Sequence, residues 1–197
     1  NKLADEDISF SVEKNKETGE MIISGLGTTQ LSVLSKKLKN KFGVEVVLKA
    51  PKIAYKETIL QKAEGEGKHK KQSGGAGQYG HAVITFEPGA SDGYYEFVDE
   101  VVGGVVPKQF IPAVDKGLRE AINHGVLAGY PLINLKATLH DGSYHPVDSS
   151  EMAFKMAAAV AYKEGIPQTA PVLLEPIGAL KVLVPDEMLG DVIGDIN

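Results

Sequence analysis

Glycine and lysine are concentrated in one segment near the middle of the chain. Four glycines fall between Gly74 and Gly80, and three lysines come just before them, at Lys68, Lys70 and Lys71. Glycine lets a partner approach the bare backbone, and lysine attracts anions. The segment therefore indicates a cationic loop that contacts an anionic surface, most often phosphate. A flexible hairpin loop with no ligand accounts for the same spacing equally well.

The same glycines match the pattern G-x-G-x-x-G at Gly75, Gly77 and Gly80. This pattern indicates a dinucleotide site only when a strand precedes it and a helix follows. Here a lysine-rich segment precedes it, and residues 83–86 are predicted to form a strand after it. The pyrophosphate would have no helix N-terminus to bind. A nucleotide-binding enzyme is therefore kept only as a remote alternative.

Other catalytic patterns are weak. The sequence contains no G-x-x-x-x-G-K-[ST] loop, and its histidines lack the spacing of known metal sites. His140 and Asp141 are adjacent loop residues, and no nucleophile stands beside them. The segment from Asp148 to Glu151 is explained by helix capping, with Asp148 as the cap and Glu151 completing a capping box. We predict no catalytic residue and no metal site.

The composition is that of an ordinary globular protein, with 43% hydrophobic and 24% charged residues among 197. No apolar run is long enough to cross a bilayer, cysteine is absent, and the polar start from Asn1 to Asp7 is not a signal peptide. We therefore expect a cytoplasmic protein without membrane contact. The net charge of −5 argues against a uniformly basic surface, yet six lysines and one acid lie between Gln30 and Lys52.

The first 53 residues predict a small α+β unit with the order strand, strand, helix, strand. Residues 21–23 form a short apolar run, and apolar residues recur at helical spacing between Leu31 and Phe42. Gly43 is placed to end this helix, and residues 44–48 are predicted as the following strand. The lysines on the other face of the helix are expected to be solvated.

The middle of the sequence predicts a second α+β unit. Its expected elements are strands at 57–63, 83–86, 94–98 and 132–139, and helices that begin near Pro112 and Asp148 and end at Gly125 and Gly165. Residues 140–147 are predicted as a turn-rich loop. Met152 and Met156 are expected to pack in the core.

The amino-acid composition changes again near Pro171, where a third part of the chain begins. Residues 177–184 predict a strand, and Pro185 is placed to begin a helix with acids in its first turn. One strand and part of a helix cannot bury a core by themselves. The sequence is therefore expected to be a piece of a longer protein.

Several long motifs resemble the elongation factor G family. They are Lys71–His81 (KQSGGAGQYGH), Pro107–Val114 (PKQFIPAV), Asp141–Lys155 (DGSYHPVDSSEMAFK), Leu174–Ile177 (LEPI) and Met188–Asp195 (MLGDVIGD). The motifs are colinear and specific, and together with Glu6, Asp7 and residues 25–27 they extend over nearly the whole chain.

The resemblance implies an α+β fold in three parts. Residues 1–53 would be most of the third domain, a truncated ferredoxin-like sandwich without its first strand and part of its first helix. Residues 54–171 would be the fourth domain, similar to the second domain of ribosomal protein S5, with two helices on one face of a sheet. Its βαβ crossover would be left-handed, against the usual rule. Residues 172–197 would begin a ferredoxin-like fifth domain.

The resemblance also implies a function. Members of this family use GTP to move transfer RNA and messenger RNA through the ribosome, and their fourth domain inserts two tip loops into the decoding centre. Those loops match Ser73–Gly80 and Gly142–Val147, with Gln78 and His145 at the tips. The implied RNA contacts are Ser73, Gly74, Gly75, Gly77, Gln78, Tyr79, Ser143, Tyr144 and His145, with Lys68, Lys70 and Lys71 as electrostatic support.

The resemblance places GTP and Mg²⁺ in an amino-terminal GTPase domain that this sequence does not include. We therefore expect no cofactor and no enzymatic activity in this chain, whereas the full-length parent would be a ribosome-stimulated GTPase. The implied partner is the ribosome, with its ribosomal RNA, transfer RNA and messenger RNA. The chain itself is expected to be monomeric.

The sequence departs from the family pattern at two places. Typical members have Gly-Met-Gly-Glu-Leu-His-Leu-Glu in the third domain, whereas residues 25–32 are Gly-Leu-Gly-Thr-Thr-Gln-Leu-Ser, and Ala76 stands where a basic residue is frequent. These departures indicate a divergent paralogue as the alternative, one that acts in ribosome recycling or in ribosome protection against tetracycline.

Overall fold

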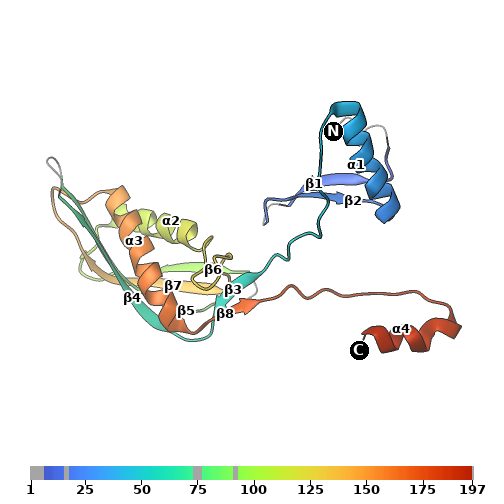
Figure 1. Cartoon of the computed structure of the whole chain (residues 1–197). Coiled ribbons are helices and arrows are strands. Elements are labelled where there is room, and N and C mark those ends of the chain that lie inside the picture. The colour runs from blue at the N-terminus through green and yellow to red at the C-terminus, as the bar shows by residue number, and fades with distance from the viewer. Residues whose placement is uncertain (1–6, 16–17, 73–76, 91–92, 197) are drawn as a thin grey trace.

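The structure, a computed structural model, describes residues 7–15, 18–72, 77–90 and 93–196. Figure 1 shows an α+β molecule in which a central unit is joined by extended segments to a smaller unit before it and to a helix after it. The elements are β1 Ser11–Lys14, β2 Met21–Ser24, α1 Thr28–Phe42, β3 Lys56–Ile59, β4 Ala63–Lys71, β5 Gln78–Pro88, β6 Tyr95–Asp99, η1 Lys108–Phe110, α2 Ile111–Ala121, β7 Leu135–Ser143, α3 Glu151–Gly165, η2 Ile166–Thr169, β8 Pro171–Leu174, η3 Asp186–Met188 and α4 Leu189–Ile196.

The first unit consists of the β1–β2 hairpin and α1. The helix ends where Gly43 adopts φ 66°, a left-handed conformation that glycine adopts without strain, as the sequence predicts. Phe10 and Leu34 are the buried hydrophobic residues of the described part of this unit. The predicted strand at 44–48 is wrong, because this segment lies extended with no ladder partner among the described residues.

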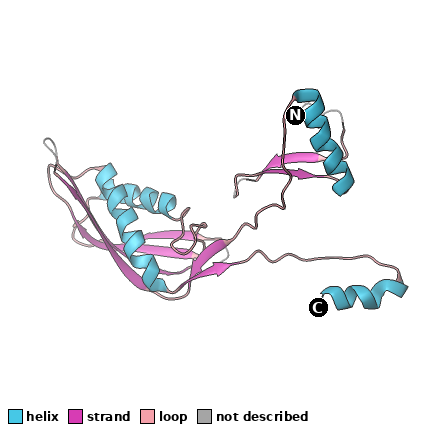
Figure 2. Ribbon diagram, in the orientation of Figure 1, coloured by secondary structure: helices cyan, strands magenta, loops and turns pink. Residues whose placement is uncertain are grey.

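The central unit is a four-stranded sheet with the order β4-β5-β7-β6. The β4–β5 and β5–β7 pairs are antiparallel, whereas β6 and β7 are parallel. Because parallel neighbours need a crossover, the chain passes through α2 between them. The two helices α2 and α3 lie on the same face of the sheet, which agrees with the prediction (Figure 2).

Alternation along the strands builds the core between this sheet and the two helices. The buried side chains include Ala82, Ile84 and Phe86 on β5, Leu135, Ala137 and Leu139 on β7, Val114 and Leu118 on α2, and Phe154, Ala158 and Ala161 on α3. The rings of Phe110 and Phe154 stack with their centroids 4.9 Å apart. The opposite face of the sheet carries polar side chains, so the sheet presents one open face.

Glycines in the hairpin let α3 lie very close to the sheet. A Cβ atom on Gly67 would lie 1.9 Å from the carbonyl oxygen of Ala157, and one on Gly65 would lie 2.2 Å from that of Ala161. A Cβ on Gly80 would likewise lie 2.5 Å from the carbonyl oxygen of Ala153. Bare backbone on the strands is therefore required opposite the small side chains of the helix.

The predicted strand at 57–63 is two strands with different partners. β3 pairs with β8 in a separate two-stranded sheet, and β4 begins only at Ala63. The break occurs because the backbone N–H groups of Leu60 and Gln61 both donate to the carbonyl oxygen of Thr169, outside the ladder.

The end of α2 differs from the prediction. α2 ends at Ala121 rather than at Gly125, because the chain turns there around the buried carboxylate of Glu57. That carboxylate accepts hydrogen bonds from the backbone N–H groups of Leu127, Ala128 and Tyr130. A Cβ on Gly125 would lie 2.2 Å from it.

The cap of α3 is Ser150, whose hydroxyl accepts from the N–H of Ala153, and not Asp148. The predicted end of this helix at Gly165 is confirmed. The methionines are not core residues, since Met152 and Met156 are exposed. Alanines on the opposite side of α3 occupy the core position instead, because only small side chains fit against the glycines of the sheet.

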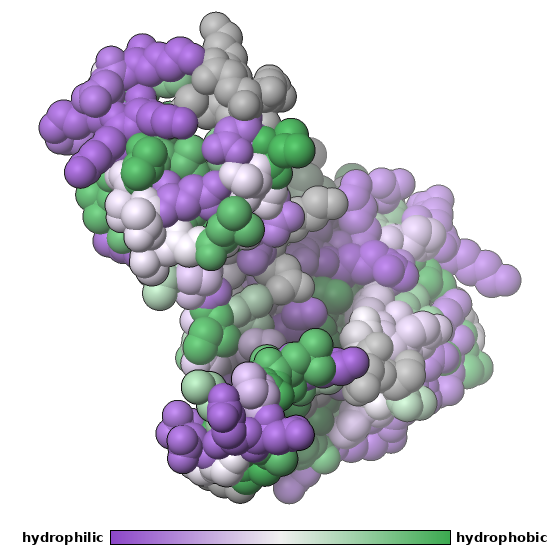
Figure 3. Space-filling model, turned by 90° about the vertical axis from the view of Figure 1, so that its right-hand side faces the viewer, coloured by the Kyte–Doolittle hydropathy of each residue, from purple (hydrophilic) through white to green (hydrophobic). Residues whose placement is uncertain are grey.

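The final segment leaves the central unit after β8. The predicted strand at 177–184 is wrong, because these residues are extended and unpaired among the described residues. A helix does begin after Pro185, through η3 and α4. Figure 3 views the molecule from the right-hand side of Figure 1, where the first unit and the final helix lie. It shows apolar side chains, in green, at the surface. No helix among the described residues has the length and apolar character needed to span a membrane.

Candidate nucleic-acid interface

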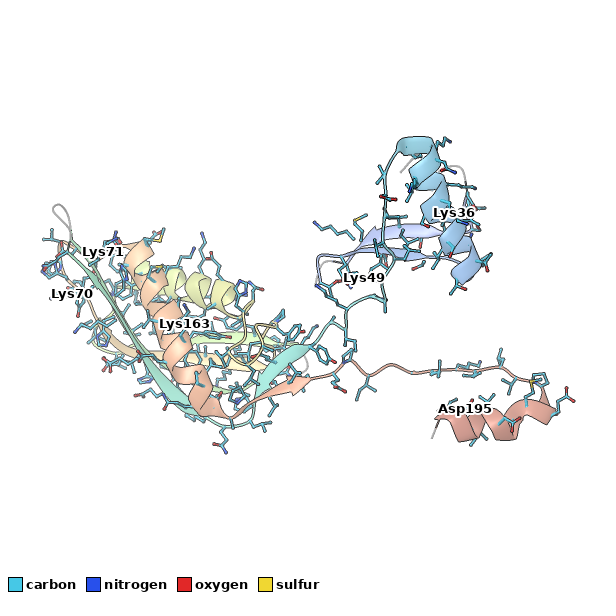
Figure 4. All side chains as sticks on the ribbon, viewed as in Figure 1. Lys36, Lys49, Lys70, Lys71, Lys163 and Asp195 are labelled. Atoms are coloured by element: carbon cyan, nitrogen blue, oxygen red, sulfur yellow. The ribbon has the colours of Figure 1, made fainter. Side chains whose placement is uncertain are left out.

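The predicted site residues gather at one end of the central unit. β4 and β5 run antiparallel to their ends at Lys71 and Gln78, which pair with each other. Figure 4 shows Lys70 and Lys71 at this end of the hairpin. Ser73, Gly74 and Gly75 were predicted to make contacts here and lie outside the described residues.

Both loops are shorter than the sequence predicts. Gln78, Tyr79 and Gly80 belong to β5, and His140 to Ser143 belong to β7. A bulge between Val83 and Ile84 shifts the register of the β5–β7 pair. Such a bulge changes the faces to which side chains point, and beyond it Ser143 lies opposite His81.

Residues 144–149 form a tight loop organised by His145. The N–H groups of Val147 and Asp148 both donate to its Nδ1 atom, at 3.3 and 3.1 Å. The N–H of His145 donates to the hydroxyl of Ser149, whose own N–H donates to the carbonyl oxygen of His145. The loop therefore holds the imidazole in place by its backbone, although half of the side chain is exposed (50%).

These contacts define which nitrogen of His145 faces outward as a donor. Since Nδ1 accepts two N–H groups, the neutral ring carries its hydrogen on Nε2. The carboxylate of Asp148 lies 3.4 Å from Nδ1, farther than the amide nitrogens that bond to it. Among the described residues nothing bonds to Nε2, so the neutral imidazole presents an N–H donor to a partner.

Tyr79 joins the start of β5 to the loop after β7. Its N–H donates to the carbonyl oxygen of Asp148 at 2.8 Å, and its carbonyl oxygen accepts from the hydroxyl of Ser149 at 2.9 Å. Its phenolic oxygen lies 2.7 Å from the hydroxyl of Ser143. The ring of Tyr79 is 6.4 Å from that of His145. Backbone and side chain of one residue therefore tie the start of β5 to the loop after β7.

Gln78 and the lysines complete the polar surface at this end. The side-chain oxygen of Gln78 lies 2.9 Å from Nε2 of His69, which leaves the amide NH₂ group as the donor available to a partner. Lys68 lies 5.8 Å from the centroid of the Tyr79 ring, a cation–π distance. The side chains of Lys68, Lys70 and Lys71 are exposed. Exposed cations and an N–H donor thus lie at this end of the hairpin, with Lys68 against the ring of Tyr79.

Two of the glycines in the motif have structural roles. Gly80 is covered by α3, and a Cβ on Gly77 would lie 2.7 Å from the carboxylate of Asp148. Gly80, the last glycine of the G-x-G-x-x-G pattern, lies in β5, so a strand and not a helix follows the pattern. This strand–loop–strand arrangement contradicts the dinucleotide alternative, because the pyrophosphate site needs a helix N-terminus.

Sequence reasoning missed the residues that support the tip. Ser149 was assigned to a capping segment, yet its hydroxyl bonds both loops. His81 and Glu66 were not predicted as site residues. His81 is hydrogen-bonded to Ser143 through Nδ1 and to Glu66 through Nε2. Their position on alternate residues of β4 and β5 was the available signal, because it places them on the open face beside Lys68 and Tyr79.

The arrangement suits hydrogen bonding to an RNA backbone. Phosphates accept hydrogen bonds, and ribose hydroxyls both donate and accept. The donors at the tip, the His145 imidazole and the Gln78 amide, match phosphate or ribose oxygens. In the described part of the chain no group of three or more acidic or histidine side chains is placed to hold a metal ion.

Comparisons with known proteins identify the family of this chain. The sequence model of elongation factor G, domain IV, matches residues 51–170, and that of elongation factor G, domain III, matches residues 1–50. A crystal structure of a protein from Thermus thermophilus superposes with a TM-score of 0.89 at 46% identity, over 99% of this chain and 29% of that protein. The chain thus spans less than a third of the length of this relative.

The fold and these matches define residues 1–170 as two adjoining domains of a translation elongation factor. The chain belongs to the elongation factor G family.

Proposed function

We propose that this chain is the ribosome-contacting part of a GTP-driven translocase, and that its tip enters the decoding centre to hold transfer RNA and messenger RNA. The observation that carries the proposal is the link through Tyr79. It holds the start of β5 against the loop after β7, so that the His145 and Gln78 donors lie at the end of a long hairpin with three exposed lysines. Donors on a rigid support are suited to a backbone contact.

The partners follow from the family and the chemistry of the tip. The chain would contact the ribosome together with transfer RNA and messenger RNA, in the cytoplasm. GTP hydrolysis with Mg²⁺ would take place in an amino-terminal domain outside this sequence, so the chain alone would bind ribosomes without hydrolysing GTP. The lysines would act through counterion release, which makes binding weaken as salt rises.

The test is single-round translocation with the full-length protein and GTP. We expect His145→Ala and Gln78→Ala each to slow translocation roughly tenfold or more, since a hydrogen bond to a charged group contributes about 1.5–3 kcal/mol. Lys163→Ala is the matched control, because this residue lies on α3, away from Lys70 and Lys71 in Figure 4. Equal rates for all variants would contradict the proposed role of the tip.

A second function is favoured by one feature, the departure of residues 25–32 from the family pattern. There the Gln30 side chain accepts from the N–H of Leu26 and donates to the hydroxyl of Ser9, contacts confined to the first unit. A paralogue acting in ribosome recycling or tetracycline protection would show ribosome-dependent GTP hydrolysis without translocation. That result would replace the first proposal by the second.

A further inference from the structure

Four side chains on the open face of the sheet form a continuous hydrogen-bonded chain. Oε1 of Glu66 on β4 lies 2.9 Å from Nε2 of His81 on β5. Nδ1 of the same imidazole lies 2.8 Å from Oγ of Ser143 on β7, and that hydroxyl lies 2.7 Å from the phenolic oxygen of Tyr79. The chain therefore crosses three neighbouring strands and ends at the residue that joins the tip loops.

With Glu66 ionised and His81 neutral, the hydrogen bonds of this chain have one consistent direction. An ionised carboxylate only accepts, so Nε2 of His81 donates to Glu66. The neutral imidazole then has an acceptor at Nδ1, which takes the hydroxyl hydrogen of Ser143. The Ser143 oxygen in turn accepts from the hydroxyl of Tyr79. The phenolic hydrogen is thereby committed, and the oxygen of Tyr79 is left as an acceptor.

A phenolic oxygen in this state discriminates between the groups of an RNA backbone. A ribose 2′-hydroxyl can donate to it, whereas a phosphate oxygen cannot, because both would be acceptors. The N–H donors of His145 and Gln78 can bond either a phosphate oxygen or a ribose oxygen. The tip would therefore combine one acceptor with several donors, a pattern that matches a ribose flanked by phosphates better than phosphates alone.

A serine protease-like mechanism is a poor explanation of the same residues. A nucleophilic serine needs its oxygen free to attack, whereas Oγ of Ser143 is bonded on both sides, to His81 and to Tyr79. Glu66 is also largely exposed, with 63% of its side chain accessible, whereas His81 is mostly covered at 17%. This arrangement suits orientation of a hydroxyl group rather than activation of a nucleophile.

We propose that Glu66, His81 and Ser143 are positioning residues for the RNA contact of the tip, holding the Tyr79 hydroxyl as a hydrogen-bond acceptor for a ribose 2′-hydroxyl. The proposal rests on the proposed function for its RNA partner. The orientation of the chain of hydrogen bonds is a property of this protein alone, so the two can be tested separately.

The first experiment measures the tautomer of His81 by ¹⁵N NMR of the 197-residue chain. We expect a neutral imidazole with hydrogen on Nε2 in the wild type. Glu66→Gln should increase the population with hydrogen on Nδ1, because the amide can also donate. Glu64→Gln, two residues away on the same strand, is the control and should leave His81 unchanged. Hydrogen on Nδ1 in the wild type would overturn the proposal, whatever the protein does on ribosomes.

The second experiment measures single-round translocation by the full-length protein. Tyr79→Phe and Ser143→Ala should each slow it roughly three- to tenfold, and the double variant should be no slower than Tyr79→Phe alone, because Ser143 acts through the Tyr79 hydroxyl. Ser143→Thr, which keeps the hydroxyl, should restore the rate. Additive losses, or no loss with Ser143→Ala, would overturn the positioning role. A wild type without translocation would instead overturn the proposed function.

Discussion

The central unit and its flanking segments differ in how their apolar residues are used. Among the described residues, Phe10 and Leu34 are the buried hydrophobic residues outside 56–174, whereas the central unit contains all the others. Val47, Ile177 and Leu183 in the flanks are 82%, 98% and 85% exposed. Similar apolar runs thus form a core in one region and remain at the surface in the other.

The difference shows that an apolar run becomes a strand only when a ladder partner is present. β5 has partners on both sides, β4 and β7, and buries alternate residues. The segments 44–48 and 177–184 have comparable sequences but no partner strand in the described structure. Backbone N–H and C=O groups without a ladder remain hydrated, and burial of such a segment would be unfavourable.

Hydrogen exchange should give the largest contrast between the two regions. We expect the amides of Ile84 and Leu139 to exchange only through global unfolding, and those of residues 45–48 and 178–184 to exchange at close to unprotected rates. At a global stability of about 5 kcal/mol or more, the rates would differ by roughly a thousandfold or more. Mass-spectrometric or NMR exchange on this chain measures this. Slow amide exchange in residues 45–48 or 178–184 would contradict the expected difference between the central unit and its flanking segments.

A glycine-to-alanine pair should distinguish the regions by stability. Gly67→Ala places a methyl group on the backbone of α3, and we expect it to lower the free energy of unfolding by about 1–3 kcal/mol or more. Gly178→Ala is the matched control, since nothing lies within 4 Å of its Cβ position. Denaturant titration compares them. Equal midpoints would mean that the close packing of α3 on β4 is absent in solution.

Glu57 provides a smaller test within the central unit. Glu57→Gln replaces a carboxylate oxygen by an NH₂ group that faces backbone N–H donors, so we expect a loss of about 1–3 kcal/mol. Glu175→Gln, on the exposed segment after β8, should change stability little. Urea unfolding of both variants measures the difference. A neutral effect of Glu57→Gln would show that the carboxylate does not organise residues 125–130.

An ion pair on the open face should give the smallest effect. The hydrogen bond from Lys136 lowers the pKa of Glu87 from its ordinary value of 4.5, with Lys62 adding a weaker attraction. The resulting stability is fully present above pH 4.5 and is lost as pH falls through the lowered pKa of the folded state. Lys136→Met should remove this contribution, a small change because solvent still reaches 35% and 27% of the two side chains and screens the pair.

The control for this pair is Lys181→Met, in the exposed segment before α4. Stability measured by urea unfolding between pH 2.5 and 6, a range chosen to span roughly two units either side of an ordinary carboxyl pKa, should differ between the variants only at the upper end. Parallel curves would show that the Lys136 contact contributes nothing in solution.

Local signals in the sequence predicted the helices well. Apolar spacing with Gly43 placed α1, Pro112 placed the start of α2, and Gly165 placed the end of α3. These features act within a few residues, so they are visible in the sequence. The methionines of α3 were misplaced, because the choice between two faces of one helix depends on what packs against it.

The same distinction applies to the site. The resemblance carried by the long colinear motifs predicted Gln78, Tyr79 and His145 together at a tip. It did not reveal Glu66, His81 or Ser149, whose roles arise from contacts between strands that are distant in sequence. Side-chain hydrogen bonds depend on register, and one bulge in the β5–β7 pair changes that register.

The sequence by itself determined the fold class, the helices and the cationic, glycine-rich character of the tip, because composition and local periodicity are properties of the chain alone. Only the tertiary structure decided which apolar runs became strands, which glycines face a helix rather than a ligand, and which hydroxyl groups orient Tyr79. Those outcomes depend on partners brought together from distant parts of the chain, and no local pattern contains that information.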